Sequence, residues 1–166
     1  MVPVEYTTPG AIFATQKKGI KMVALTARPA SIRDMTVNEL KMAGIDLSLT
    51  APKGNFQLNK KPNDSGYYNG IIFADLNNDK GVILNEFLTR AGLDPKKVVF
   101  LDDIKQNAIT VDEALASKGI ECLCVRYGGA DAVVKKFDPK IADVQLKNIE
   151  QNLSDDDAKK LAKKKR

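Results

Sequence analysis

The stretch KVVFLDD, residues 97–103, places four consecutive apolar residues directly before two acids, Asp102 and Asp103. A short strand that is apolar on both faces is typical of a parallel sheet, in which helices cover both sides. Ligands bind outside the carboxyl ends of such strands. We therefore expect residues 97–101 to form a central strand that brings both carboxylates to the binding edge of an α/β sheet.

Helices and strands alternate on both sides of this stretch. Apolar periodicity, with glycine after helices and proline at a helix start, defines them. The predicted elements are a helix at 10–19, a strand at 20–25, a helix at 31–43, a strand at 70–74, a helix from Lys80, the strand at 97–101, a helix at 105–118 and a strand at 120–125. Repeated βαβ units predict a Rossmann-like parallel sheet with helices on both faces.

The remaining segments are less regular. Residues 45–49 are a candidate strand, and residues 51–66, with two prolines and two glycines, favour a loop. A further helix is predicted near residues 139–152. Ser154 precedes three aspartates and is a good N-cap for a closing helix. We expect one domain, residues 1–153, followed by a lysine-rich tail at 154–166.

Charge and hydropathy exclude several classes of protein. The net charge is +5, but the last eight residues alone carry six cationic side chains, so the body of the chain is not basic. No apolar run approaches the roughly 20 residues that span a bilayer. We therefore expect no nucleic-acid partner and no membrane partner, and the tail is interpreted as a solvated helix end.

The cysteine and histidine content limits the kinds of catalysis that the chain can perform and bears on its cellular compartment. Histidine is absent, which excludes Ser-His-Asp and Cys-His catalysis. Cys122 and Cys124 lie two apart in a predicted strand and share one face, where we expect free, buried thiols. Free thiols and the lack of a signal peptide favour the cytoplasm, unless an export signal lies upstream of these residues.

Three polar signals fall at or near the ends of predicted strands: Thr26, Lys80 and the pair Asp102 and Asp103. A hydroxyl with adjacent backbone amides can bind phosphate oxygens, and a lysine can neutralise charge on a transferring phosphoryl group. A carboxylate pair can hold Mg²⁺. Together these residues predict a site for a phosphate and a divalent cation.

Each of these residues could instead have a purely structural role. Thr26 and Asp103 could each cap the helix that follows. Lys80 could be a solvated side chain on an amphipathic helix. Arg28 could contact a substrate or form a structural salt bridge, and the residues alone do not decide between these roles.

In this chain order the motifs resemble those of the haloacid dehalogenase-like superfamily of phosphohydrolases. Its second motif, an apolar strand ending in threonine or serine, matches residues 23–28. Its third motif, a lysine opening a helix, matches residues 79–84. Its fourth motif, an apolar strand ending in paired acids, matches residues 98–103, with a supporting amide at Asn107. The resemblance covers about residues 10–128.

Through the stretches QKKG at residues 16–19, LTARP at 25–29 and NGIIF at 69–73, the chain is similar to an uncharacterised bacterial branch of the superfamily. The resemblance implies a phosphomonoesterase core in which Thr26 and Lys80 bind the phosphate and Asp102 and Asp103 bind Mg²⁺. It also implies a phosphorylated small molecule as the substrate, with contacts from Ala27, Arg28 and Asn107.

The first motif of the superfamily is missing. That motif is Asp-x-Asp at the end of the preceding strand, and it supplies the phosphate-attacking nucleophile and a general acid/base. No apolar strand ending in Asp-x-Asp precedes Thr26. Asp75 follows an apolar strand, but it comes after the second motif and has Asn77 in place of the second acid, so we do not expect it to substitute. A receiver domain is also disfavoured, because its acids come first and its lysine last.

Three function classes stay open. The first is a phosphatase-like hydrolase, inactive as this fragment because its N-terminal part lies outside the chain. The second is a pseudoenzyme that keeps ligand binding, and the third is an interaction module. In the superfamily the missing strand lies between those ending at Thr26 and Asp103. We therefore expect a gap filled by the missing segment or a homodimer partner, direct pairing of the two strands, or marginal stability.

Overall fold

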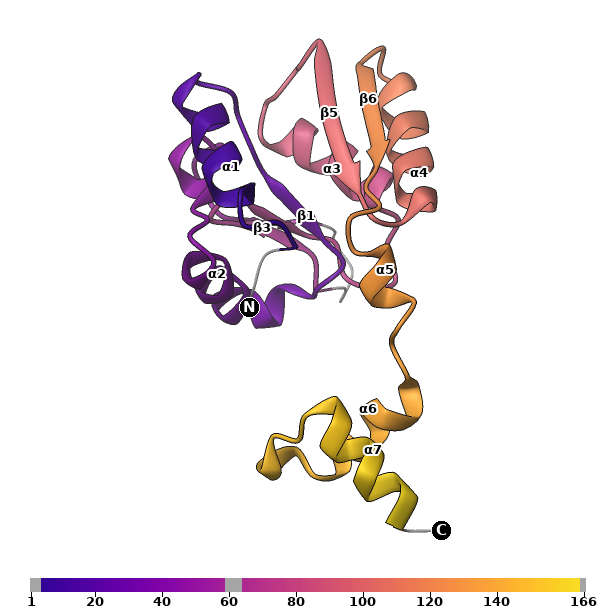
Figure 1. Cartoon of the computed structure of the whole chain (residues 1–166). Coiled ribbons are helices and arrows are strands. Elements are labelled where there is room, and N and C mark those ends of the chain that lie inside the picture. The colour runs from indigo at the N-terminus through magenta and orange to yellow at the C-terminus, as the bar shows by residue number, and fades with distance from the viewer. Residues whose placement is uncertain (1–3, 59–63, 165–166) are drawn as a thin grey trace. The chain divides into compact units, whose positions relative to one another are not determined.

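The computed structural model describes residues 4–58 and 64–164 and divides the chain into two compact units, residues 1–128 and 129–166 (Figure 1). The first unit contains α1 (Thr8–Lys17), β1 (Ala24–Thr26), η1 (Ala30–Ile32), α2 (Arg33–Met42), η2 (Leu47–Leu49), β2 (Phe56–Gln57), β3 (Gly66–Tyr68), β4 (Ile71–Phe73), α3 (Lys80–Arg90), β5 (Lys97–Asp102), α4 (Lys105–Ala116) and β6 (Glu121–Arg126). The second contains α5 (Asp131–Val134), α6 (Pro139–Lys147), η3 (Ile149–Gln151) and α7 (Asp155–Lys164).

The first unit has an α/β fold with two sheets. One sheet has the strand order β1-β4-β3-β2, with β1 parallel to β4 and the other neighbours antiparallel. The second sheet consists of β5 and β6, which are parallel over their whole length. The predicted α/β class is confirmed, although the larger sheet is mixed and not purely parallel.

The antiparallel part arises from a tight hairpin at Asn69 and Gly70. Both residues have positive φ angles, 51° and 84°, and they join β3 directly to β4 with Tyr68 opposite Ile71. Asn-Gly is the preferred pair for a two-residue hairpin, because both central positions of that turn need a positive φ. The turn adds β3, and with it β2, to the outer side of β4.

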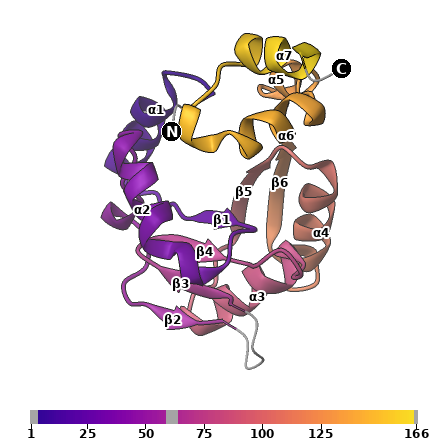
Figure 2. The ribbon, with the colours of Figure 1, turned by 90° about the horizontal axis from the view of Figure 1, so that it is seen from below.

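Helices cover both faces of the larger sheet, as the sequence predicts (Figure 2). Alternate residues of β4 point to opposite sides, because side chains in a strand have a period of two. Ile72 and Ala74 join the main core with α3 and α4, whereas Ile71 and Phe73 pack with residues of α1 and α2. Burial on both faces explains why β4 is apolar throughout.

The smaller sheet is covered on one face. Val98 and Phe100 of β5 pack with Val111 and Leu115 of α4 in the main core, and Cys122 and Cys124 of β6 join them. The opposite face presents four apolar side chains that are 38–60% exposed: Val99, Leu101, Leu123 and Val125. The sequence predicts burial of this strand on both sides. Among the described residues of the first unit, no helix packs on its second face, which stays partly exposed.

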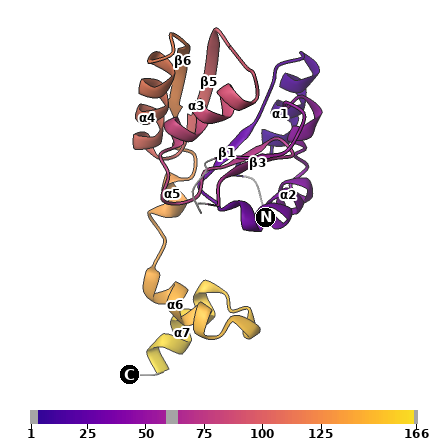
Figure 3. The same cartoon turned by 180° about the vertical axis from the view of Figure 1, so that it is seen from behind.

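The inner edges of both sheets are unpaired among the described residues. There β1 pairs with β4 alone and β5 pairs with β6 alone, so direct pairing of β1 with β5 is excluded within residues 4–58 and 64–164 (Figure 3). Open strand edges carry N–H and C=O groups that need partners. A single continuous sheet, which would contradict the expected gap, is not formed.

Two predictions about local structure are wrong. Residues 45–49 are not a strand: Leu47–Leu49 form a 3₁₀-helix, because the Asp46 carboxylate accepts hydrogen bonds from both the backbone N–H and the hydroxyl of Ser48. The loop predicted at residues 51–66 contains the short strand β2.

The prediction of free thiols is also wrong, because Cys122 and Cys124 form a disulfide. Their Cα atoms are 5.5 Å apart. That distance lies well inside the range of about 4.4–6.8 Å that disulfides need, whereas an ideal strand would separate them by about 6.6 Å. Placement on the same face of the strand therefore allows the bond. With both cysteines in a disulfide, cysteine usage does not favour a cytoplasmic location.

In the second unit, α6 and α7 pack through Ile141 and Ala158, both of which are buried. Ser154 caps α7, as predicted, by accepting a hydrogen bond from the backbone N–H of Asp157 at 3.2 Å. Residues 129–153, which the sequence assigns to the core domain, belong to the same compact unit as the tail.

The packing of α3 against α4 depends on Gly81. A Cβ atom at this position would lie 2.3 Å from the carbonyl oxygen of Thr110 and 2.8 Å from Cβ of Ala114. We predict that Gly81→Ala lowers the free energy of unfolding by about 2 kcal/mol, since overpacking in a core typically costs 1–3 kcal/mol. Urea denaturation followed by circular dichroism measures the effect.

Gly10→Ala is the matched control, because Gly10 is also helical but has no atom within 4 Å of an added Cβ. Alanine there should leave stability unchanged or raise it by up to about 1 kcal/mol. Equal effects of the two substitutions would show that the close contact between α3 and α4 is absent in solution.

Candidate active site

Lys80 stands at the first position of α3 and points to the end of β5. The helix begins there because the Asp79 carboxylate accepts a hydrogen bond from the backbone N–H of Val82, at 3.0 Å. Nζ of Lys80 lies 2.7 Å from Oδ2 of Asp102, and the two side chains are only 12% and 5% exposed. Lys80 is therefore not a solvated surface side chain, and it forms a nearly buried ion pair.

Asp102 is held by three hydrogen-bond donors. Oδ2 accepts from Lys80, while Oδ1 accepts from the backbone N–H of Ile104 at 2.8 Å and from Nδ2 of Asn107 at 2.9 Å. Burial by itself would raise the pKa of Asp102, but these hydrogen bonds and the charge of Lys80 hold that pKa below its ordinary value. Asp102 is thus a fixed carboxylate anion.

Asp103, the residue after Asp102, is exposed. Its backbone carbonyl accepts a hydrogen bond from Nε of Arg126 at 3.0 Å. The N-cap residue of α4 is Ile104, and no side chain caps this helix end. Asp103 therefore does not cap α4, a role that the sequence had left open to it. Its carboxylate is exposed to solvent next to Asp102 in the chain.

Thr26 ends β1 in the neighbouring sheet. Its hydroxyl accepts a hydrogen bond from the backbone N–H of Arg28 at 3.2 Å, and its carbonyl accepts from the N–H of Ala74 at 2.7 Å. The ends of β1 and β4 are thereby joined, and the chain continues from β4 to Lys80. Among the described residues, no hydrogen bond links Thr26 with Lys80 or Asp102.

Two further predicted contact residues lie in the turn after β1. Arg28 forms an ion pair with Glu39 of α2 and donates to the hydroxyl of Thr36 at 3.1 Å, which corresponds to the structural role left open by the sequence. Ala27 is half-buried between Thr26 and Arg28. The structure thus brings together Lys80, Asp102 and Asn107, and holds Thr26 and Ala27 at the end of the adjacent sheet.

The residues that turn the chain from β4 into α3 are not among the predicted site residues, although the sequence indicates a turn at Asn77, Asn78 and Asp79. Asp75 has a positive φ of 64°, and Nδ2 of Asn78 donates to the carbonyl of Ala74 at 2.6 Å. Asp and Asn are the non-glycine residues that most readily adopt such conformations and bond to nearby backbone groups. The run of Asp and Asn residues at 75–79 was the available signal for this turn.

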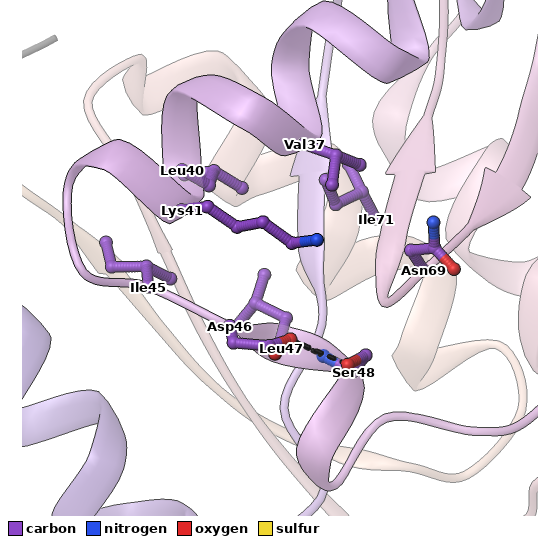
Figure 4. Close-up of a pocket in the computed structure, with 9 residues that line it drawn as sticks. All are labelled: Val37, Leu40, Lys41, Ile45, Asp46, Leu47, Ser48, Asn69 and Ile71. Atoms are coloured by element: carbon purple, nitrogen blue, oxygen red, sulfur yellow. Dashed lines mark hydrogen bonds between the residues drawn. The ribbon is translucent and has the colours of Figure 1, made fainter.

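A pocket of about 130 Å³ lies elsewhere in the first unit (Figure 4). Its lining includes residues of α2 and η2 together with Asn69 and Ile71 at the start of β4. The Asp46–Ser48 hydrogen bond forms part of its wall. The pocket is therefore at the amino end of β4, whereas Lys80 and Asp102 gather at carboxyl ends, and it contains none of the predicted site residues.

The chain belongs to the family described as "Protein of unknown function (DUF2608)", whose model matches residues 1–159. It is 28% identical over 156 residues to a "Putative outer membrane protein" of Chlamydia pneumoniae, covering 94% of this chain and 58% of that protein. It is 26% identical over 160 residues to a "Putative outer membrane protein" of Chlamydia trachomatis, covering 96% of this chain and 59% of that protein. No solved structure matches.

The chain thus spans less than two thirds of the length of these relatives. In the described part of the chain, no helix combines the length and the apolar character that crossing a membrane requires.

Removing one partner of the ion pair between Lys80 and Asp102 should be costly, although the intact pair itself adds little to stability. We predict that Asp102→Asn lowers the free energy of unfolding by about 3 kcal/mol, because it leaves a nearly buried ammonium without its partner. Adding Lys80→Met should restore part of the loss, which a double-mutant cycle measures. The exposed pair Lys97 and Glu121 is the control, and Glu121→Gln should cost less than about 1 kcal/mol.

The difference in unfolding free energy between wild type and Asp102→Asn should also depend on pH, in a direction that the pKa of Asp102 determines. Because the folded pKa of Asp102 is lowered, its contribution is present above the ordinary aspartate pKa of about 3.9 and is lost as the pH falls through the folded value. The stability difference between wild type and Asp102→Asn should shrink below about pH 4. A difference that stays constant or grows on acidification would contradict the assigned ion pair.

Proposed function

We propose that this chain is the phosphate- and magnesium-binding part of a phosphomonoester hydrolase of the haloacid dehalogenase-like kind. The observation that carries the proposal is the hydrogen-bonded group of Lys80, Asp102 and Asn107. The lysine and the acid are 22 residues apart in the sequence and come from different elements. They meet at the carboxyl end of a parallel strand, where α/β folds bind ligands.

Each residue of the site would have its own role in the reaction. The Lys80 ammonium, fixed by Asp102, would stabilise charge on a transferring phosphoryl group. The Thr26 hydroxyl and the backbone of Ala27 would hold phosphate oxygens from the side of β1. Asn107 orients Asp102, since its amide occupies Oδ1 and leaves Oδ2 to Lys80.

The acids fit a magnesium ion that is bound mainly by other ligands. A carboxylate offers about four acceptor sites, and protein donors take three of those on Asp102. Asp102 would thus give one oxygen to the ion, and the exposed carboxylate of Asp103 could give another. Mg²⁺ commonly binds in this way, through one or two carboxylates with water and substrate phosphate. When bound, it would polarise the phosphate oxygens.

We propose that the nucleophile comes from a strand outside residues 1–166 that lies between β1 and β5. Three observations support this: the unpaired inner edges of both strands, the apolar face of β5 and β6, and relatives that are considerably longer than this chain. A strand in that position would end beside Thr26 and Asp102. Its aspartate would attack phosphorus and form an aspartyl-phosphate, which water then hydrolyses.

A pseudoenzyme is the second candidate, and one observation favours it. Lys80 and Asp102 already neutralise each other at 2.7 Å. In this chain, no apolar strand ending in Asp-x-Asp comes before Thr26. Such a site could bind phosphate by exchanging partners of Lys80 without any chemical step.

Phosphate release from a generic aryl phosphate with Mg²⁺ tests the proposal. We predict turnover by the complete polypeptide that the gene encodes, and none by residues 1–166 alone. In the complete polypeptide, Lys80→Met and Asp103→Asn should each lower kcat/KM by about 100-fold, the usual cost of removing a group that stabilises developing charge. Lys97→Met is the control, because Lys97 is exposed at the opposite end of β5.

Other results would favour other functions. Magnesium-dependent phosphate binding by calorimetry without turnover would indicate the pseudoenzyme, and neither binding nor turnover would indicate an interaction module. Turnover by residues 1–166 that Asp102→Asn abolishes would contradict the proposed external nucleophile.

A further inference from the structure

A second group of potential ligands lies where α4 packs against β6. Asp112 of α4 and both cysteines of β6, Cys122 and Cys124, each offer one ligand atom, and these three atoms all lie within 4.8 Å of one another. The two cysteines are half-buried, and Asp112 is exposed. This group is separate from Lys80 and Asp102 and plays no part in the proposed hydrolase chemistry.

Local structure explains why the three side chains converge. Residues two apart in a strand point to the same face, so both sulfurs of β6 face α4. Val111 and Leu115 of α4 are fully buried in the core that the cysteines join. Asp112 follows Val111 at the rim of this packing, so its carboxylate reaches the sulfurs from the solvent side.

The oxidation state decides what this group can bind. In the structure the sulfurs form a disulfide, whereas the metal-binding form of cysteine is the thiolate. A dithiol reductant supplies two electrons and two protons. The Sγ–Sγ bond breaks, both cysteines become thiols, and the reductant becomes a disulfide. Binding of a divalent cation would then release the two thiol protons.

The ligand set favours zinc over magnesium. Two thiolates and one carboxylate carry three negative charges, and soft sulfur ligands select zinc-like ions and not Mg²⁺. Three protein ligands with water in the fourth position are a common tetrahedral zinc arrangement. Zinc–sulfur bonds of about 2.3 Å require ligand atoms roughly 3.7 Å apart. After reduction the two sulfurs, which are bonded to each other in the disulfide, must move apart to that distance, and the Asp112 carboxylate, within 4.8 Å of both, must move closer. Rotamer changes of the three side chains allow both movements.

We propose that Asp112, Cys122 and Cys124 form a zinc site gated by oxidation. A dithiol reductant opens the site by breaking the disulfide, and a small disulfide oxidant, which accepts two electrons and two protons to become two thiols, closes it again. The chain would thus bind a thiophilic divalent cation only under reducing conditions.

Zinc titration of the oxidised and the dithiol-reduced protein, in competition with a chromophoric chelator, tests this proposal. The reduced protein should bind one equivalent of Zn²⁺ at least tenfold more tightly than the oxidised protein, and added Cd²⁺ should produce a thiolate charge-transfer absorption. Asp112→Asn should weaken binding by the reduced protein about tenfold, whereas the neighbouring exposed carboxylate variant Glu113→Gln should not.

Several outcomes would overturn the proposal. Equal zinc affinity in both oxidation states would remove the gating, as would an aerobically purified protein with two titratable thiols. Equal affinity of Asp112→Asn and wild type would exclude the carboxylate as a ligand. Cys122→Ser/Cys124→Ser, if folded by circular dichroism, should lose the reduced-state site, and the aspartate and glutamate variants decide the question even if it does not fold.

Discussion

The contact between Lys80 and Asp102 is the interaction on which the candidate site depends. It joins the first residue of α3 to the last residue of β5 and thus connects the end of a helix with the end of the second sheet. Desolvating two charges is costly, and such a pair is stable only when its other hydrogen-bonding positions are satisfied. Ile104 and Asn107 provide this satisfaction for Asp102. A pair retained at this cost is more readily understood as part of a binding site than as a source of stability.

The open edges of β1 and β5 are the second constraint. Within the described residues, both strands are paired on their outer sides alone. The face of β5 and β6 opposite the one that α4 covers carries four apolar side chains in partial contact with solvent: Val99, Leu101, Leu123 and Val125. Unpaired edges beside apolar surface are a liability that proteins normally cover. An additional strand and its flanking polypeptide would pair the open edges and cover the apolar surface together, so one segment would complete both the sheet and the proposed site.

The sequence predicted most helices and strands and the meeting of Lys80 with Asp102, because apolar periodicity and strand-end chemistry are local signals. It also placed Thr26 in this group, but no hydrogen bond among the described residues joins Thr26 to either side chain. The supporting amide of Asn107 was implied by the family resemblance. The sequence did not predict the hairpin at Asn69 and Gly70, although that dipeptide is a strong turn signal, since β3 is too short to show alternation. The Cys122–Cys124 bond was missed because two residues on one face of a strand were assumed to be too far apart. The role of Arg28 was undetermined because its partner Glu39 lies on a helix whose position the sequence did not define.

The most direct test of the account is amide hydrogen exchange at the inner edge of β5. The carbonyls of Lys96 and Asp102 accept hydrogen bonds from the N–H groups of Glu121 in β6 and Tyr127 just after it. The N–H groups of the alternate residues Val99 and Leu101 therefore point to the unpaired edge. We predict that both amides exchange rapidly in residues 1–166 and slowly in the complete polypeptide encoded by the gene, because an inserted strand protects them. Rapid exchange of both amides in the complete polypeptide would contradict the account.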